Sequence, residues 1–96
     1  MANEAFGPTQ LAVIRAMRAD KNNEVPISTL FGMVCPGQIP GTPRQNQQKL
    51  GPFIARLNRK FVRLEVEDRI RPGKTRNTYK LWKSQAIYMK WRETSV

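Results

Sequence analysis

Hydrophobic residues recur with a helical period near the start of this chain. Leu11, Ile14 and Met17 lie three residues apart, so one face of residues 9–20 is apolar, and this pattern predicts a helix. Thr9 is its expected N-cap, because a threonine hydroxyl accepts a hydrogen bond from a free amide of the first helical turn. Turn-forming residues follow and are expected to end the helix.

Two shorter elements are predicted next. Val25 precedes a proline, which disfavours the helical region of backbone space, so residues 25–27 are expected to be extended. Ser28 or Thr29 is expected to cap a short helix that ends before the Cys-Pro-Gly sequence at residues 35–37. The glycine- and proline-rich stretch beyond it predicts a connector.

The clearest helical pattern lies in the middle of the chain. Its apolar residues, at intervals of three or four, are Leu50, Phe53, Ile54, Leu57 and Phe61. Thr42 followed by Pro43 is typical of a helix start, with an N-cap and then a proline at the first helical position. An interior proline costs a helix about 3 kcal/mol. The helix is therefore expected either to kink at Pro52 or to start afresh there after a short turn over residues 43–50.

Alternation replaces the helical period after residue 61. Apolar and charged residues alternate over residues 62–70, which predicts a strand, although Leu64 also fits one more helical turn. Residues 71–77 have the composition of a turn, and residues 78–82 favour a second strand. The two strands and the loop are therefore expected to form a β-hairpin with a basic tip.

The last predicted element is a helix from Ser84, its N-cap, to about Arg92. Ile87 and Trp91 would line one side of it, and we predict a homodimer that packs through these two side chains. The aromatic residues in this part of the chain are expected to pack against the hairpin or a second chain rather than stack on single-stranded bases. They are Tyr79, Trp82, Tyr88 and Trp91.

The distribution of charge adds a preference for an anionic partner. The formal net charge is +10, from 17 lysines and arginines against seven aspartates and glutamates. Residues 1–43 contain three basic and three acidic side chains, so the whole excess lies in residues 44–96. A polyanion partner explains such segregation, because each phosphate that a cation neutralises releases condensed counterions.

The composition also excludes several classes of function. The chain has no histidine and a single cysteine, Cys35, which excludes Ser-His-Asp or Cys-His catalysis, an imidazole-ligated metal and an internal disulfide. A lone thiol fits a reducing compartment, and neither a membrane-spanning run nor a signal-peptide pattern is visible. We therefore expect a cytoplasmic, nucleoid-associated protein that is not an enzyme and uses no cofactor or small-molecule substrate.

The order of these elements resembles the winged helix-turn-helix domain, and most closely the DNA-binding domain of two-component response regulators. In that family the third helix ends in a run like Ile-x-x-Leu-x-x-Lys-Leu, and the second wing strand ends in Tyr-x-Leu. The matching residues here are Ile54, Leu57, Lys60 and Phe61 and, later, Tyr79 and Leu81. The resemblance covers roughly residues 9–82.

This resemblance implies an α+β fold, a three-helix winged helix-turn-helix with a C-terminal β-hairpin wing and an extra C-terminal helix. It divides the chain into a flexible arm over residues 1–8, a winged-helix DNA-binding domain over residues 9–83, and a helix or tail for dimerisation over residues 84–96. Small phage regulators and excisionases use the same fold at this length.

Helical geometry defines the face of the third helix that would meet DNA. With Ile54 on the buried side, a turn of 100° per residue places a polar and basic set of side chains opposite, and Gln47 near the buried side. The first turns of a recognition helix reach base edges, so the candidates for base contacts are Arg44, Gln45, Gln48 and Lys49. The candidates for phosphate contacts are Arg56, Arg59 and Lys60.

The loop of the hairpin gives a second candidate site. A basic loop can enter the minor groove or bridge phosphates. The residues expected to do so are Arg71, Lys74, Thr75, Arg76 and Asn77.

The sequence therefore predicts a sequence-specific double-stranded DNA-binding protein, a small transcriptional regulator or a phage or mobile-element factor. Two alternatives fit the same charge. One is an RNA-binding or ribosome-associated basic protein, which would need a stacking platform or a shape-reading surface. The other is a winged-helix module that docks on an acidic protein such as a polymerase subunit.

Overall fold

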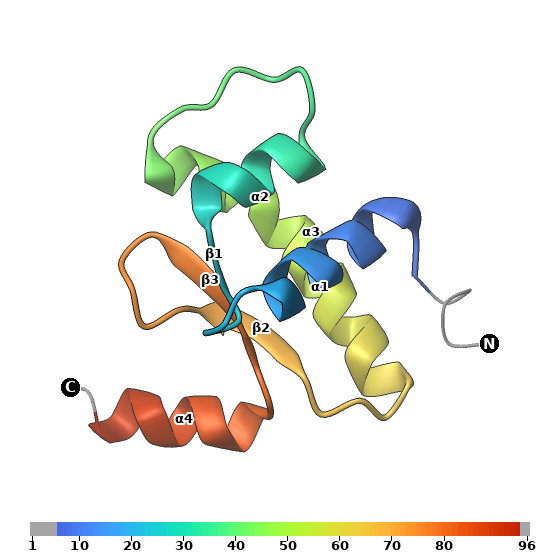
Figure 1. Cartoon of the computed structure of the whole chain (residues 1–96), viewed down its shortest axis with the longest axis vertical. Helices are drawn as coiled ribbons and strands as arrows, with labels where there is room; N and C mark the ends of the chain where they lie inside the picture. Colours follow the sequence, from blue (N-terminus) through green and yellow to red (C-terminus); the bar gives the residue numbers. More distant parts are fainter. Residues whose placement is uncertain (1–5, 95–96) are drawn as a thin grey trace.

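The computed structural model describes residues 6–94, which form an α+β domain (Figure 1). The elements are α1 (Pro8–Ala19), β1 (Glu24–Pro26), α2 (Ile27–Val34), α3 (Pro43–Arg63), β2 (Arg69–Pro72), β3 (Thr78–Trp82) and α4 (Gln85–Thr94). The predicted α+β class is confirmed by these four helices and a three-stranded antiparallel sheet. Within the described residues, no helix combines the length and apolar composition that a membrane span requires.

The sheet has the strand order β1-β3-β2, so β3 is central. Val25 of β1 lies opposite Tyr79 of β3, and Ile70 of β2 lies opposite Leu81 of β3. Successive side chains of a strand point to opposite faces. Tyr79 and Leu81 therefore face the core, while Trp82 lies on the other face, where α4 packs.

The core fills the space between the first three helices and the inner face of the sheet. Its fully buried side chains are Phe31, Phe61, Met17, Leu30, Leu50, Leu57, Ile70 and Val13. Each such side chain contributes about 1.5–3 kcal/mol when it leaves water. The helical spacing of these residues in the sequence therefore fixes which side of each helix faces inward, and leaves the opposite side of α3 in solvent.

The predicted start of α3 is confirmed in detail. The hydroxyl of Thr42 accepts a hydrogen bond from the amide of Gln45 at 3.2 Å, and the side chain of Gln45 accepts one from the amide of Thr42 at 2.9 Å. This reciprocal pair satisfies amides that have no partner inside the helix. Pro43 follows as the first helical residue, where a missing N–H costs nothing.

Pro52 lies inside α3, which is one helix of 21 residues and does not restart there. Figure 1 shows its first turns set at an angle to the remainder. The cause is the proline ring, which removes one helical hydrogen bond and clashes with the preceding turn. Pro52 is on the exposed side of the helix, so water can hydrate the carbonyl that loses its partner.

The strand predicted over residues 62–70 is wrong in its first part, because α3 continues to Arg63 and β2 contains only Arg69–Pro72. The alternative of one more helical turn is confirmed, since the amide of Leu64 donates to the carbonyl of Lys60 at 2.9 Å. The helix ends with two hydrogen bonds, from the amide of Glu65 to the carbonyl of Val62 at 3.1 Å and from that of Val66 to that of Phe61 at 2.8 Å. Glu65 adopts the left-handed conformation this ending requires, with φ of 59°. The alternating apolar residues do not mark a buried strand face, since Val62 is 59% exposed.

The predicted caps of the other three helices differ in outcome. The N-cap of α1 is Gly7 rather than Thr9. The start of α2 follows Pro26 directly without a side-chain cap, so neither Ser28 nor Thr29 caps it. The predicted cap of α4 is confirmed, because the hydroxyl of Ser84 accepts a hydrogen bond from the amide of Ile87 at 3.1 Å.

The arm predicted over residues 1–8 is only partly described. Residues 1–5 lie outside the described part of the chain. In the described part, the ring of Phe6 packs against that of Phe61 with 5.8 Å between centroids, and Pro8 is the first residue of α1. The domain therefore includes these residues, because an aromatic pair buries apolar area that an arm in solvent would expose.

A buried asparagine joins α3 to the hairpin. The side-chain amide of Asn58 donates to the carbonyl of Ile70 at 3.0 Å, and its oxygen accepts from the amide of Ile70 at 2.8 Å. β2 is an edge strand, so these backbone groups have no neighbouring strand to pair with. Asn58 takes the place of that strand and fixes the hairpin against α3.

Replacing Asn58 by leucine, which has a similar volume, should lower the free energy of unfolding by about 3 kcal/mol, because the two backbone groups of Ile70 lose their partners inside the protein. Denaturant titration measures the difference. The matched control is Asn22→Leu at an exposed position, for which we expect a change below about 0.5 kcal/mol. Equal effects of the two substitutions would contradict this account of Asn58.

Burial raises the pKa of the Tyr79 hydroxyl above its ordinary value of about 10, and a hydrogen bond with Gln47 opposes this rise. In the unfolded chain the pKa returns to its ordinary value, so the unfolded state loses the proton first as the pH rises. The stability that depends on this group is therefore complete below about pH 10 and is lost as the pH rises through the raised pKa of the folded state.

The free energy of unfolding should accordingly fall more steeply above pH 10 for the wild type than for Tyr79→Phe, which has no ionisable group at this position. Lysines also titrate in this range, but they do so in both proteins, so the difference between the two curves isolates the tyrosine. Chemical unfolding at several pH values between 8 and ~11.5 provides the measurement. Parallel curves would show that Tyr79 does not contribute.

Candidate nucleic-acid interface

The outward face of α3 is polar and cationic. Its exposed polar and basic side chains, with Pro52, are Arg44, Gln45, Gln48, Lys49, Arg56, Arg59 and Arg63, and the exposed apolar residues Ala55 and Val62 lie among or beside them. This is the face that helical geometry predicts. The 21 residues of α3 include six lysines and arginines and no aspartate or glutamate.

The positive charge of this face is not neutralised by any ion pair within residues 6–94. Among residues 6–94 the structure has one ion pair, between Arg18 and Asp68 at 3.4 Å, and it involves no residue of α3. Unpaired cations on one face of a protein with a net charge of +10 create a positive potential that attracts an anionic partner.

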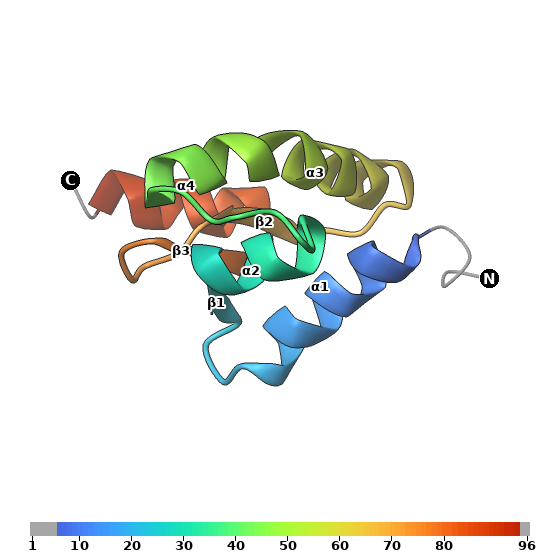
Figure 2. The same ribbon diagram turned by 90° about the horizontal axis from the view of Figure 1, so that it is seen from above.

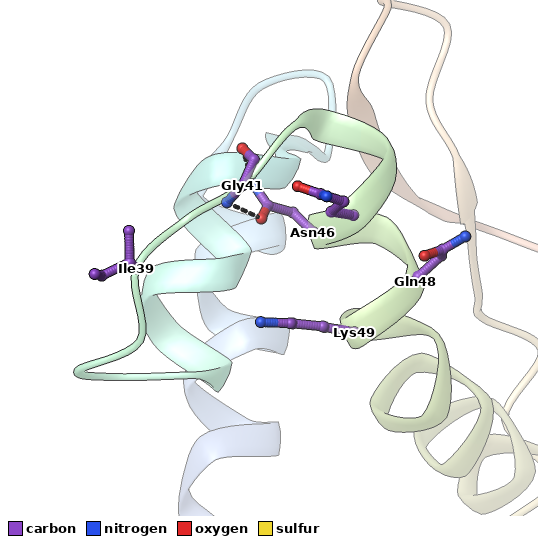
Figure 3. Close-up of a pocket in the computed structure, with 6 residues that line it drawn as sticks. Ile39, Gly41, Asn46, Gln48 and Lys49 are labelled. Atoms are coloured by element: carbon purple, nitrogen blue, oxygen red, sulfur yellow. Dashed lines mark hydrogen bonds between the residues drawn. The ribbon is translucent and has the colours of Figure 1, made fainter.

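Lys49 and Gln47, from the first half of α3, point away from Gln48 in different directions. Lys49 points toward the connector before α3, away from Gln48 (Figure 3), and its ammonium is 3.5 Å from the side-chain oxygen of Gln38. Gln47 is exposed, but it lies on the side of α3 that the prediction gave it, because it interacts with the hydroxyl of Tyr79, which faces the core.

Lys60 does not belong to the outward face, contrary to the prediction of a phosphate contact. It is half-buried, and its ammonium donates to the side-chain oxygen of Gln10 at 2.8 Å and lies 5.9 Å from the ring of Phe6. The start of α1 packs against this end of α3 through Phe6 and Phe61 and draws the lysine toward it.

Arg71 is also placed differently from the prediction of a wing contact. It belongs to β2 rather than to the loop, since the strand continues to Pro72. Its guanidinium donates to the side chain of Gln85 in α4 at 3.1 Å and to the carbonyl of Ile70 at 3.2 Å. The side chain is half-buried and serves to join the hairpin to α4.

The loop of the hairpin, which we call the wing loop, contains residues 73–77. Its exposed members are Lys74, Thr75, Arg76 and Asn77. Asn77 has a structural task, because it adopts the left-handed conformation with φ of 58° and its carbonyl accepts from the amide of Ile27 at 2.9 Å. The ammonium of Lys74 lies 5.9 Å from the ring of Trp82. Arg76 is exposed.

The connector between α2 and α3 forms the other border of the face. A depression of about 380 Å³ lies between this connector and the first turns of α3. Figure 3 shows residues that line it. Asn46 is buried there and holds the connector, since its oxygen accepts from the amide of Gly41 at 2.8 Å and its nitrogen donates to the carbonyl of Gly41 at 3.4 Å. Ile39 in the same connector is 88% exposed.

The wing loop and the start of α3 lie at the same end of the molecule, as Figures 1 and 2 show from two directions. A groove of about 440 Å³ separates them and is lined by the start of α2, the connector and residues 75–78. The opposite end of α3 is remote from the loop in both views. The structure therefore brings the first turns of α3 and the wing loop to the same end of the molecule, and separates both from the last turn of α3.

The aromatic residues near the carboxyl end pack on one another. The rings of Trp82 and Trp91 are 5.1 Å apart, and those of Trp82 and Tyr88 are 5.2 Å apart. Trp91 is thereby half-buried within its own chain, whereas Ile87, the other residue of the predicted dimer contact, is 50% exposed. The homodimer stays a prediction.

Three residues that shape this face were not predicted, namely Glu24, Asn46 and Asn58. The sequence could have indicated that the two asparagines are buried. Each lies four residues from an apolar residue of α3 and therefore on the buried side of the helix. The sequence around Glu24 does not indicate its role, because the residues that donate hydrogen bonds to its carboxylate, Lys74 and Thr75, are some 50 residues away.

Comparisons with protein-family models, with curated proteins and with solved structures found no match for this chain. A function for this face is therefore derived from its own residues, charge and geometry.

Proposed function

We propose that this chain is a sequence-specific double-stranded DNA-binding protein of the winged helix-turn-helix type, which acts by occupying its site as a transcriptional regulator or a mobile-element factor. The observation that supports the proposal best is the outward face of α3. It is rich in arginine and glutamine, has no carboxylate, and begins beside an exposed basic loop. The order helix, strand, two helices and hairpin is also that of the winged helix-turn-helix domain.

The first turns of α3 would read base edges. An α-helix with its side chains is about 10–12 Å wide, and the major groove is about 12 Å wide. Arg44 suits guanine, and Gln48 suits adenine, because each can form two hydrogen bonds to that base. Gln45 is less suited to reading, since its side-chain oxygen already accepts from the amide of Thr42.

The remaining cations would hold the duplex by its backbone. Arg56 and Arg59 follow the base-reading turns on the same face, and Lys74 and Arg76 are exposed on the wing loop. Contacts of this kind set the position of a protein on DNA and contribute affinity that depends on salt rather than on sequence.

The alternative of single-stranded RNA binding has less support. Stacking on unpaired bases requires accessible aromatic faces. Trp82 and Tyr88 are buried and Trp91 is half-buried, and the three rings pack against one another. Competition between a duplex and a folded RNA for the protein tests this preference directly.

Selection of bound duplexes from a random pool should first yield a preferred site. Gln48→Ala should then weaken discrimination at one base pair of that site by about 1–3 kcal/mol, because the amide that reads the base is removed. Titration of duplexes that differ at single positions measures the change.

The matched control is Gln47→Ala, which removes the same side chain one residue earlier and on the side of α3 that faces Tyr79. It should leave base preference unchanged. Equal loss of discrimination in both variants, or in neither, would show that this face of α3 does not read bases.

Replacing both Lys74 and Arg76 by alanine should weaken binding to all duplexes by a similar factor. It should also reduce the slope of log affinity against log salt by about 0.9 for each phosphate that the protein no longer neutralises. Titrations at several salt concentrations give both quantities.

The control removes the same charge elsewhere, with Lys90→Ala and Arg92→Ala on the exposed side of α4. Its salt slope should stay close to that of the wild type. A slope that changes as much in the control as in the wing variant would mean that overall charge alone attracts the duplex.

A further inference from the structure

The wing loop is tied to the sheet by a carboxylate from a distant part of the chain. Glu24 of β1 accepts hydrogen bonds from the amide of Lys74 at 2.5 Å, from the amide of Thr75 at 3.4 Å and from the hydroxyl of Thr75 at 3.0 Å. The single ion pair among residues 6–94 does not involve Glu24. Its charge is therefore balanced by backbone amides and a hydroxyl rather than by a lysine or arginine.

The loop is shaped to receive this carboxylate. A Cβ atom at Gly73 would meet the hydroxyl oxygen of Thr78 and lie 2.9 Å from a carboxylate oxygen of Glu24, so a larger residue would displace these side chains from their present positions. The amide of Gly73 donates to the carbonyl of Thr78 at 2.9 Å, and the hydroxyl of Thr78 donates to the carbonyl of Thr75 at 2.6 Å. These bonds close the loop at its base.

Glu24 is itself held in place on the other side. Its amide donates to the carboxylate of Asp20 at 3.1 Å, and the amide of Asn22 donates to the same oxygen at 2.8 Å. These two bonds hold the pKa of Asp20 below its ordinary value, the one from Glu24 contributing most. Glu24 also pairs with Lys80 in the ladder between β1 and β3. The backbone that carries its side chain is thus fixed before the side chain reaches the wing loop.

We propose that Glu24 is a positioning residue that holds the wing loop in the shape in which Lys74 and Arg76 grip a duplex. This inference rests on the proposed function. Ordering a free loop on binding would subtract its conformational entropy from the affinity. Three hydrogen bonds to Glu24 order the loop when the protein folds, so that binding does not have to do so.

Two effects of Glu24 on a polyanion have opposite signs. Its negative charge lies near the contact and by itself weakens binding, whereas its hydrogen bonds to the loop strengthen it. Glu24→Gln and Glu24→Ala remove the same charge, but only glutamine keeps an acceptor oxygen at the same reach. The ratio of their affinities therefore isolates the positioning effect from the charge effect.

The test measures the affinity of both variants for the selected duplex, or for a generic duplex if selection yields none. Glu24→Ala should bind about fivefold more weakly than Glu24→Gln, as expected for the loss of one to two net hydrogen bonds. The ratio should fall to about one when Lys74 and Arg76 are both replaced by alanine, because Glu24 acts through them. A residue that only stabilised the fold would give the same ratio in both backgrounds.

Amide hydrogen exchange supplies a readout that needs no DNA. The amides of Lys74 and Thr75 should exchange faster in Glu24→Ala than in Glu24→Gln, while the amides of β3 keep equal protection in the two variants. If Glu24→Ala does not fold, Thr75→Val replaces it, with Thr75→Ser as its control, because serine retains the hydroxyl that Glu24 accepts from.

Several results would overturn the inference. Equal affinities of the two Glu24 variants for duplex, with wild-type binding intact, would show that only the charge of Glu24 matters and would leave the proposed function standing. A ratio that persists without Lys74 and Arg76 would assign Glu24 to general stability. If the wild type binds no duplex, the proposed function and this inference fail together.

Discussion

The bond between Asn58 and Ile70 decides where the hairpin lies. β2 has four residues and an unpaired outer edge, so the sheet alone does not fix its distance from α3. The side-chain amide of Asn58 supplies one donor and one acceptor, as the peptide group of a neighbouring strand would. Separating the two residues would leave the amide and carbonyl of Ile70 buried without hydrogen-bond partners. This cost in free energy makes the helix and the hairpin behave as one rigid part. Everything proposed for the wing loop depends on this rigidity.

The same helix uses a second asparagine in the same way at its other end. Asn46 holds the connector through both backbone groups of Gly41, twelve residues before Asn58 and about 18 Å away along the axis. The buried side chains of α3 that form hydrogen bonds to other elements are therefore neutral amides. An unpaired arginine or lysine buried at these positions would cost free energy. This division leaves the cations of α3, apart from Lys60, on its surface, where they are hydrated and free to meet a partner.

The sequence predicted correctly those features that depend on a local pattern within one helix or strand. Thr42 and Pro43 define the start of α3, and its apolar spacing defines the outward face, so most of the candidate face could be predicted. Contacts between distant elements could not, because no local pattern contains them: Lys60 pairs with Gln10 of α1, and Arg71 with Gln85 of α4. The end of α3 was missed for another reason. Its left-handed residue is a glutamate, whereas glycine is the usual signal for that conformation.

The aromatic cluster on the outer face of the hairpin gives the molecule an internal optical probe. Trp82 and Trp91 are the two tryptophans of the chain, and their rings are 5.1 Å apart. The ammonium groups of Lys74 and Lys80 lie 5.9 Å and 5.2 Å from the ring of Trp82. A ligand or a change of the loop that moves the ammonium of Lys74 away from the ring of Trp82 changes the electric field at that ring. The emission of the unlabelled protein consequently senses the state of its wing loop.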